Sequence, residues 1–199
     1  RIPTYEHTTF FPRMYNDQDA TKIQGYKDWS GYDSREDADT EIGKDGKRLP
    51  TFGENLTYFF SYQVNWMYFR YFLWNFSGRQ NDIQGHGDQM RGNWISGFSY
   101  IDATRLGNQD EAAPYYTSQN PSNNKFFFLP LILGIIGLVF HYYRAPKDAF
   151  IVTLVFLFTG LAIVIYLNQK PFEPRERDYA YPGSFYFFAI WIGLGVLAL

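Results

Sequence analysis

Two long apolar stretches in the last third of the chain dominate its pattern of hydrophobic and polar residues. Residues 126–143 (FFFLPLILGIIGLVFHYY) and residues 150–167 (FIVTLVFLFTGLAIVIYL) contain no Asp, Glu, Lys or Arg. A helix rises about 1.5 Å per residue, so a run of about 18 residues nearly covers the ~30 Å hydrocarbon core of a bilayer. The pattern predicts two transmembrane helices joined by the short polar turn RAPKD at residues 144–148.

A third apolar stretch ends the chain. Residues 184–199 (SFYFFAIWIGLGVLAL) follow Pro182 and Gly183, and Ser184 is a suitable N-cap. They predict a third transmembrane helix that is truncated before it finishes crossing. Because the chain also begins at Arg1 without a starting Met, we interpret the sequence as a fragment of a larger membrane protein.

Residues 54–76 (ENLTYFFSYQVNWMYFRYFLWNF) combine polar side chains at roughly helical spacing with many aromatic ones. This pattern predicts a helix that lies at the membrane interface. A transmembrane crossing stays open as an alternative, although Arg70 at the centre of a span would cost about 2.5 to 3.5 kcal/mol. Such a crossing would place residues 1–53 and residues 77–125 on opposite sides of the bilayer.

The remaining segments are polar and rich in turn-forming residues. We expect residues 1–53 to form an irregular extracytoplasmic segment and residues 77–125 to form an extracytoplasmic polar loop. The positive-inside rule places Arg144 and Lys147 of the RAPKD turn in the cytoplasm, and therefore the charged loop at residues 170–183 outside. The predicted fold class is an α-helical polytopic membrane protein with one interfacial helix and three transmembrane helices.

Composition excludes several classes of function. The 199 residues include no cysteine, which excludes disulfides, thiolate metal sites and cysteine nucleophiles. The formal net charge is −2, and Lys and Arg are scattered among Asp and Glu instead of forming a basic stripe. A nucleic-acid partner is therefore not expected. The sequence also contains neither a phosphate-binding Gly-Lys loop nor a dinucleotide fingerprint.

Residues 173–178 (EPRERD) carry five charged side chains within the loop at residues 170–183. Placing them in hydrocarbon would cost several kcal/mol each, so we expect this loop at the membrane surface. Arg175 and Arg177 are suited to bind a phosphate or pyrophosphate bidentately. Their neighbours, Glu176 and Asp178, would orient the arginines or act as a base. The alternative is a cluster of internal salt bridges that only caps the flanking helices.

A second polar cluster spans residues 74–97 (WNFSGRQNDIQGHGDQMRGNWISG), where glycines allow tight turns. Aromatic faces beside amide, carboxylate and guanidinium groups are a common arrangement for binding sugars. The candidate residues for binding a sugar or an acceptor, including one tyrosine of the charged loop, are Trp74, Asn75, Arg79, Asn81, Asp82, His86, Asn93, Trp94 and Tyr179. The alternative is an ordered polar loop packed on the membrane domain.

His86 with Asp82 and Asp88 raises the question of a metal site. Metal sites need ligands held in firm geometry, and the glycine-rich flanks of this segment argue against that. We therefore expect neither a metal nor another cofactor.

Several stretches resemble one family of proteins. They are TFGENLTYFF (51–60), MYFRYFLWNFSGRQNDIQGHGD (67–88), GNWISG (92–97), RLGNQD (105–110) and YLNQKPFEPRERDYAYPGSFYFFAIWIGLG (166–195). Together they resemble a multispanning bacterial membrane family of unknown function that is related to transmembrane protein O-mannosyltransferases and grouped with the GT-C glycosyltransferases. The resemblance covers nearly all of residues 50–199, whereas residues 1–49 match only loosely.

The resemblance implies a multi-pass enzyme of the bacterial inner membrane whose large loops face the periplasm. Its implied reaction is transfer of a sugar, mannose in the related enzymes, from a polyprenyl-phosphate donor to Ser or Thr of exported proteins. Arg175 and Arg177 would hold the lipid phosphate, and residues 74–97 would contact the sugar or the acceptor. The implied partners are the lipid bilayer, the lipid-linked sugar and the exported acceptor protein.

The catalytic base is not identified by this resemblance. GT-C enzymes usually place their key acidic residue in an early external loop, which is not part of this sequence. Asp82, Glu176 and Asp178 are therefore the candidates for catalytic support. Since a shared fold does not fix a shared function, the alternative is a non-catalytic membrane scaffold or a transporter-like subunit whose charged clusters form a protein interface.

Overall fold

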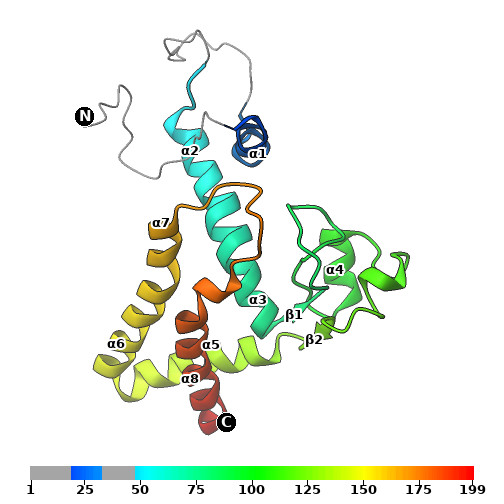
Figure 1. The fold of residues 1–199 in the computed structure, drawn as a ribbon. Coiled ribbons are helices and arrows are strands. Elements are labelled where there is room, and N and C mark those ends of the chain that lie inside the picture. Colours follow the sequence, from blue (N-terminus) through cyan, green and yellow to red (C-terminus); the bar gives the residue numbers. More distant parts are fainter. Residues whose placement is uncertain (1–18, 33–47) are drawn as a thin grey trace, which may run out of the picture.

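The computed structural model describes residues 19–32 and 48–199, and most of these residues are helical (Figure 1). In chain order the elements are α1 (Ala20–Ser30), α2 (Phe52–Tyr58), η1 (Phe59–Phe69), α3 (Arg70–Phe76), β1 (Gly78–Arg79), α4 (Ser99–Leu106), η2 (Pro114–Tyr116), β2 (Asn124–Lys125), α5 (Leu129–Arg144), α6 (Pro146–Leu157), η3 (Phe158–Ala162), α7 (Ile163–Leu167), η4 (Asp178–Ala180) and α8 (Pro182–Ala198).

The segment expected to be irregular, residues 1–53, lies largely outside the described residues. Its described part contains the helix α1, so the expectation is wrong there. Asp19 caps α1 by accepting hydrogen bonds from the N–H groups of Thr21 and Lys22. At the other end Gly31 adopts a left-handed conformation with φ of 69°, which ends the helix.

α2, η1 and α3 form one long helix at the centre of the molecule (Figure 1). It begins with a capping box between Thr51 and Glu54, and its middle part, η1, has π-helical hydrogen bonding. Its aromatic face is buried against the rest of the chain: Tyr58 and Tyr71 are at most 1% exposed. The sequence predicted a helix here, and most of its aromatic side chains pack inside the protein, while Phe60 and Phe69 are exposed. Its placement at a membrane interface stays a prediction.

The three apolar stretches are helical close to their expected bounds. α6, η3 and α7 form one continuous helix from Pro146 to Leu167. α5 begins three residues later than the expected residues 126–143, because Phe127 and Phe128 adopt left-handed backbone conformations with φ of 54° and 58°.

Of the described residues, one helix, Pro146–Leu167, is long and apolar enough to cross a bilayer. It has 22 residues, and only 11% of its most apolar window is buried inside the protein. α5 and α8 are apolar but shorter, with 16 and 17 residues. The sequence predicted three transmembrane helices, and the structure supports one helix of sufficient length.

α5 packs most extensively on α8 and crosses it, while α8 runs back beside α6 (Figure 1). Glycines allow this close crossing: a Cβ at Gly137 would overlap the carbonyl oxygen of Trp191, and one at Gly195 would overlap that of Leu133. Neither position has room for a side chain, so the two backbones are in direct contact.

The polar region at residues 77–125 is folded around two short strands and the helix α4. β1 and β2 pair antiparallel, with Gly78 opposite Lys125. Asp102 of α4 accepts hydrogen bonds from the N–H groups of Ser96 and Gly97, at 2.7 and 2.9 Å, and so fixes the preceding turn. This region was expected to be a loop, and local side-chain hydrogen bonds give it more structure than its composition suggested.

The charged loop connects α7 to α8 and passes along η1 (Figure 1). Tyr58 donates a hydrogen bond to the carbonyl of Gln169 at 2.9 Å, and Tyr62 donates one to the carbonyl of Lys170 at 2.9 Å. Because phenols of a rigid central helix hold these carbonyls, the loop has a fixed course over the central helix.

Candidate functional site

The two charged clusters predicted from the sequence, residues 74–97 and 170–183, lie against each other. Gln84 donates a hydrogen bond to the carbonyl of Glu173 at 2.7 Å, and the rings of His86 and Phe172 are 5.0 Å apart. Segments far apart in the sequence therefore meet at one place beside the central helix.

Arg70, on the central helix, joins these clusters. Its guanidinium forms an ion pair with Glu176 at 2.8 Å and donates a hydrogen bond to the carbonyl of Gly92 at 2.8 Å. The ion pair is largely shielded from water, because the Arg70 side chain is 2% exposed. A buried charge needs such a partner, so Arg70 holds both loops in place.

Aromatic rings surround the Arg70 guanidinium. It lies over the rings of Trp66, Tyr71 and Trp74, at 4.2, 4.3 and 4.7 Å from their centroids. Tyr71 also donates a hydrogen bond to Glu176. Burial raises the pKa of Tyr71, so its hydroxyl stays protonated and can donate at neutral pH.

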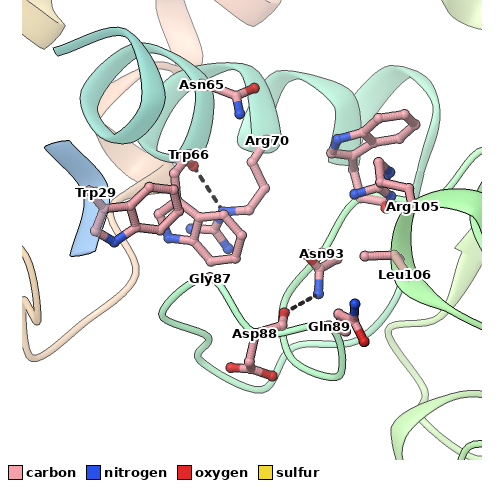
Figure 2. A pocket seen from close by; sticks show the side chains of 11 residues that line it. Trp29, Asn65, Trp66, Arg70, Gly87, Asp88, Gln89, Asn93, Arg105 and Leu106 are labelled. Atoms are coloured by element: carbon pink, nitrogen blue, oxygen red, sulfur yellow. Dashed lines mark hydrogen bonds between the residues drawn. The ribbon is translucent and has the colours of Figure 1, made fainter. Parts of the chain in front are cut away.

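A pocket of about 410 Å³ opens beside Arg70 (Figure 2). Its walls carry indole rings, two guanidiniums and several amide or carboxylate groups. These groups come from α1, the central helix, residues 87–94 and α4. Its lining residues are Trp29, Asn65, Trp66, Arg70, Gly87, Asp88, Gln89, Asn93, Trp94, Arg105 and Leu106. The volume falls within the range that is usual for small-molecule sites.

Trp29 forms the wall of the pocket that belongs to α1 (Figure 2). Its ring centroid is 5.7 Å from that of Trp66, and its carbonyl accepts a hydrogen bond from Ser61 at 2.7 Å. Gly87 comes close to the Trp29 ring with a φ of 104°, and a Cβ there would lie 2.6 Å from an indole carbon. Only glycine lets the loop approach Trp29 in this way.

Arg105 and Trp94 form the wall opposite α1. The Arg105 guanidinium stacks on the Trp94 ring at 3.8 Å from its centroid and donates a hydrogen bond to the Trp94 carbonyl. Burial lowers the pKa of Arg105 to about 10, against a smaller opposing effect of Asp102. This guanidinium is therefore held in an environment that does not favour its charge.

Of the sugar-binding candidates predicted from the sequence, Asn93 and Trp94 line the pocket. Trp74 and Arg79 lie next to it: the Arg79 guanidinium stacks on the Trp74 ring at 3.9 Å, and burial lowers the pKa of Arg79. The indole N–H of Trp74 is buried and has no hydrogen-bond partner among the described residues.

The other candidates of residues 74–97 lie outside the pocket. Asn81 is fully buried, and its amide accepts from Ile83 and Gly92 and donates to two loop carbonyls, so it shapes the loop. Asn75 and His86 are exposed.

Asp82 is also exposed and accepts a hydrogen bond from Asn120 at 3.0 Å. This hydrogen bond is the main reason that the pKa of Asp82 lies below its ordinary value of 3.8. Asp82 is thus ionised at neutral pH and held at the surface of residues 77–125.

The charged loop places its predicted residues in different environments. Arg177 pairs with Glu173 at 2.8 Å, whereas Arg175 is exposed and has no ion pair within the described ranges. Asp178 and Tyr179 are exposed. Glu176 is bound by Arg70 and Tyr71, so its oxygens are already occupied by the protein.

Several pocket residues were not anticipated as site residues. Asn65 and Trp66 lie in the predicted interfacial helix, and Arg105 begins the RLGNQD stretch of the family resemblance, but none of them was proposed as a site residue. Trp29 lies in a segment expected to be irregular, and Arg70 was considered only for its cost in a membrane span. The spacing of Trp66 and Arg70 by one helical turn was the available signal, since it puts both side chains on one face.

Across the part of the chain that the structure describes, no group of three His, Asp or Glu side chains is arranged to hold a metal ion. A comparison with known protein families matches residues 1–60 to a family of unknown function (DUF8416). No curated protein and no solved structure shows a significant match to the chain.

Proposed function

We propose that this chain is part of a membrane glycosyltransferase that takes its sugar from a polyprenyl-phosphate donor, with the sugar held in the tryptophan-lined pocket. The observation that carries the proposal is the pocket itself, which places Trp29, Trp66 and Trp94 beside buried amide and guanidinium groups. Apolar C–H faces of a sugar stack on indole rings, while its hydroxyls bind amides and charged groups.

The apolar helices support a membrane location. A long apolar helix with most of its surface exposed would be unfavourable in water but is suited to lipid or to neighbouring helices. In the proposed arrangement Pro146–Leu167 crosses the bilayer, and α5 and α8 complete a three-helix membrane part. The pocket would then lie on the periplasmic side, because the charged loop follows the end of α7 and its Glu176 pairs with Arg70 of the pocket.

The proposed acceptor is a Ser or Thr side chain of an exported protein, as the resemblance to protein O-mannosyltransferases implies. Glu176 is a poor candidate for the base that would deprotonate this hydroxyl, since Arg70 and Tyr71 already occupy it. We assign Glu176 a positioning role instead. Asp82 and Asp178 are accessible, and the catalytic base is not assigned to either.

Binding of a lipid-linked sugar tests the proposal. The full chain in detergent micelles is titrated by calorimetry with a short-chain polyprenyl-phosphate mannose and with the corresponding glucose compound. We expect saturable binding, weakened about tenfold by Trp66→Ala or Trp94→Ala, because each removes a stacking ring. Tyr179→Ala is the matched control, since it removes an exposed ring outside the pocket. The proposal fails if neither compound binds.

A second candidate function is a non-catalytic membrane scaffold. The observation that favours it is that Arg70 and Glu176, and Arg177 and Glu173, neutralise one another inside the chain. A scaffold would bind neither sugar compound, and the tryptophan variants would then behave like wild type in the same titration.

A further inference from the structure

Arg105 differs from the other arginine of the pocket in its charge partner. Arg70 is paired with Glu176, whereas Arg105 forms no ion pair anywhere in residues 19–32 and 48–199. The carboxylate that acts on it electrostatically, Asp102, accepts hydrogen bonds from two backbone N–H groups with its two oxygens. Among the described residues, Arg105 therefore has only the indirect electrostatic effect of Asp102 and no carboxylate in direct contact.

The surroundings of Arg105 make this unpaired charge notable. Its Nε is buried and has no partner among the described residues, and the guanidinium is fixed by stacking on Trp94. The other charged pocket residue, Asp88, has its carboxylate on the side away from Arg105 (Figure 2). That carboxylate accepts from the N–H of Met90 and lies 3.7 Å from Arg91, so it does not serve as the partner of Arg105.

A partly buried guanidinium without a directly contacting counter-ion is stabilised when an anion from outside completes it. Guanidiniums bind phosphate oxygens with directed, charge-assisted hydrogen bonds, and a low-dielectric wall strengthens them. Arg105 faces the same cavity as the three tryptophans. An anion and an attached sugar can thus be bound in one pocket.

We propose that Arg105 is the phosphate-binding residue of the tryptophan pocket, and that the ligand is a sugar joined to a phosphate ester. This inference rests on the proposed function, and it replaces Arg175 and Arg177 as the phosphate-binding pair. Arg177 is neutralised by Glu173, and Arg175 is exposed to solvent, where a phosphate contact is weak. The phosphate ester comes either from a lipid-linked sugar or from a soluble sugar phosphate.

Calorimetric titration of the full chain in detergent micelles distinguishes these possibilities. The probes are methyl α-mannoside, mannose 1-phosphate, short-chain polyprenyl-phosphate mannose and inorganic pyrophosphate. We expect both sugar phosphates to bind at least about tenfold more tightly than the neutral glycoside. If the lipid-linked probe binds more tightly than mannose 1-phosphate, the phosphate ester comes from a lipid-linked sugar. If the two probes bind with equal affinity, it comes from a soluble sugar phosphate.

Arg105→Gln is expected to weaken binding of the sugar phosphates about tenfold or more and to weaken binding of methyl α-mannoside much less. Arg105→Lys keeps the charge without the planar fork and is expected to retain part of the affinity for the sugar phosphates. Arg91→Gln is the matched control, because Arg91 is an exposed arginine of the same region that does not line the pocket. Arg175→Gln is expected to behave like this control.

The inference is overturned if the Arg105→Gln variant binds sugar phosphates as tightly as the wild type does. It is also overturned if the Arg175→Gln variant, instead, loses the higher affinity for sugar phosphates over the neutral glycoside. If pyrophosphate binds in an Arg105-dependent way and none of the sugar compounds binds, the anion site at Arg105 is supported and the proposed function is rejected.

Thermal unfolding without ligand measures the structural role of Arg105. Because Arg105 stacks on Trp94 and binds its carbonyl, Arg105→Gln is expected to unfold at a somewhat lower temperature. A folded variant that loses mainly the higher affinity for sugar phosphates supports the inference, and a variant in which the affinities of all the probes fall equally has lost a structural arginine and overturns it.

Discussion

Arg70 and Glu176 form a bidentate ion pair, with distances of 2.8 and 3.4 Å, between the central helix and the charged loop. The two residues are 106 positions apart in the sequence. The same guanidinium binds the carbonyl of Gly92, so a single side chain that lines the pocket joins three segments of the chain. The geometry of the pocket therefore depends in part on this pair.

Glu176→Gln should destabilise the protein strongly. It leaves the Arg70 charge buried without a partner, which costs about 3 to 5 kcal/mol in proteins. The free energy of unfolding in detergent micelles, followed by circular dichroism, measures the effect. Glu173→Gln is the matched control, because its pair with Arg177 is more exposed and should contribute about 1 kcal/mol or less. Equal losses for both variants would show that burial of Arg70 does not matter.

Gly137→Ala should weaken the packing of α5 on α8. A methyl group there overlaps the carbonyl oxygen of Trp191, so the two helices must separate, at a cost of about 1 to 3 kcal/mol or more. Gly193→Ala on α8 is the control, since a Cβ there meets nothing within 4 Å, and alanine is the better helix former. The same unfolding measurement should therefore show Gly193→Ala as stable as wild type or slightly more stable. A neutral Gly137→Ala would contradict the close crossing.

Tyr68→Phe should destabilise the contact between the central helix and α8. Tyr68 and Ser184 share a buried hydrogen bond of 2.6 Å, and removing the phenol oxygen leaves the Ser184 hydroxyl without that partner. The expected loss is about 1 to 3 kcal/mol in the free energy of unfolding. Tyr186→Phe, on the exposed face of α8, removes the same oxygen and should change little. Identical behaviour of the two variants would argue against a buried bond.

Asp82 should titrate below 3.8, and Asn120→Ala should move its pKa back toward that value. The hydrogen bond from Asn120 favours the ionised carboxylate, so it stabilises the folded state above the unfolded pKa of 3.8. That stabilisation is lost as the pH falls through the lower folded pKa. Carboxyl-carbon chemical shifts of Asp82, followed between pH 2 and pH 6, measure both values. An unchanged pKa in Asn120→Ala would reject this cause.

The positions of the apolar helices were predictable because long charge-free runs leave few alternatives to a helix. The start of α5 was not predictable, since nothing in the sequence marks the left-handed conformations of Phe127 and Phe128, whose rings pack near that of Phe98. The sequence also did not show which aromatic side chains of residues 54–76 pack inside the protein, as Tyr58 and Tyr71 do, and which stay exposed, as Phe60 does. Composition alone does not show whether an apolar or aromatic side chain contacts lipid or another segment of the same protein.

The pocket was only partly predictable for a similar reason. Trp94 and Asn93 lie in a segment whose residue types suggested a site, whereas Trp29 and Arg105 are separated from it by other elements. Their contribution depends on how α1 and α4 fold back against the central helix. Charged residues such as Asp178 were predicted as site residues because charges are evident in a sequence. Which charges line a cavity depends on pairing and burial, which the sequence does not show.

The position of Trp29 in the sequence affects how the protein can be divided into fragments for study. Trp29 belongs to the stretch matched by the family of unknown function, residues 1–60, while Trp66 and Arg105 lie beyond it. Expressing the matched stretch and the remainder separately would divide the binding cavity between two polypeptides. Ligand screens on either piece alone should therefore give false negatives, the more so because a cut after residue 60 falls inside the central helix.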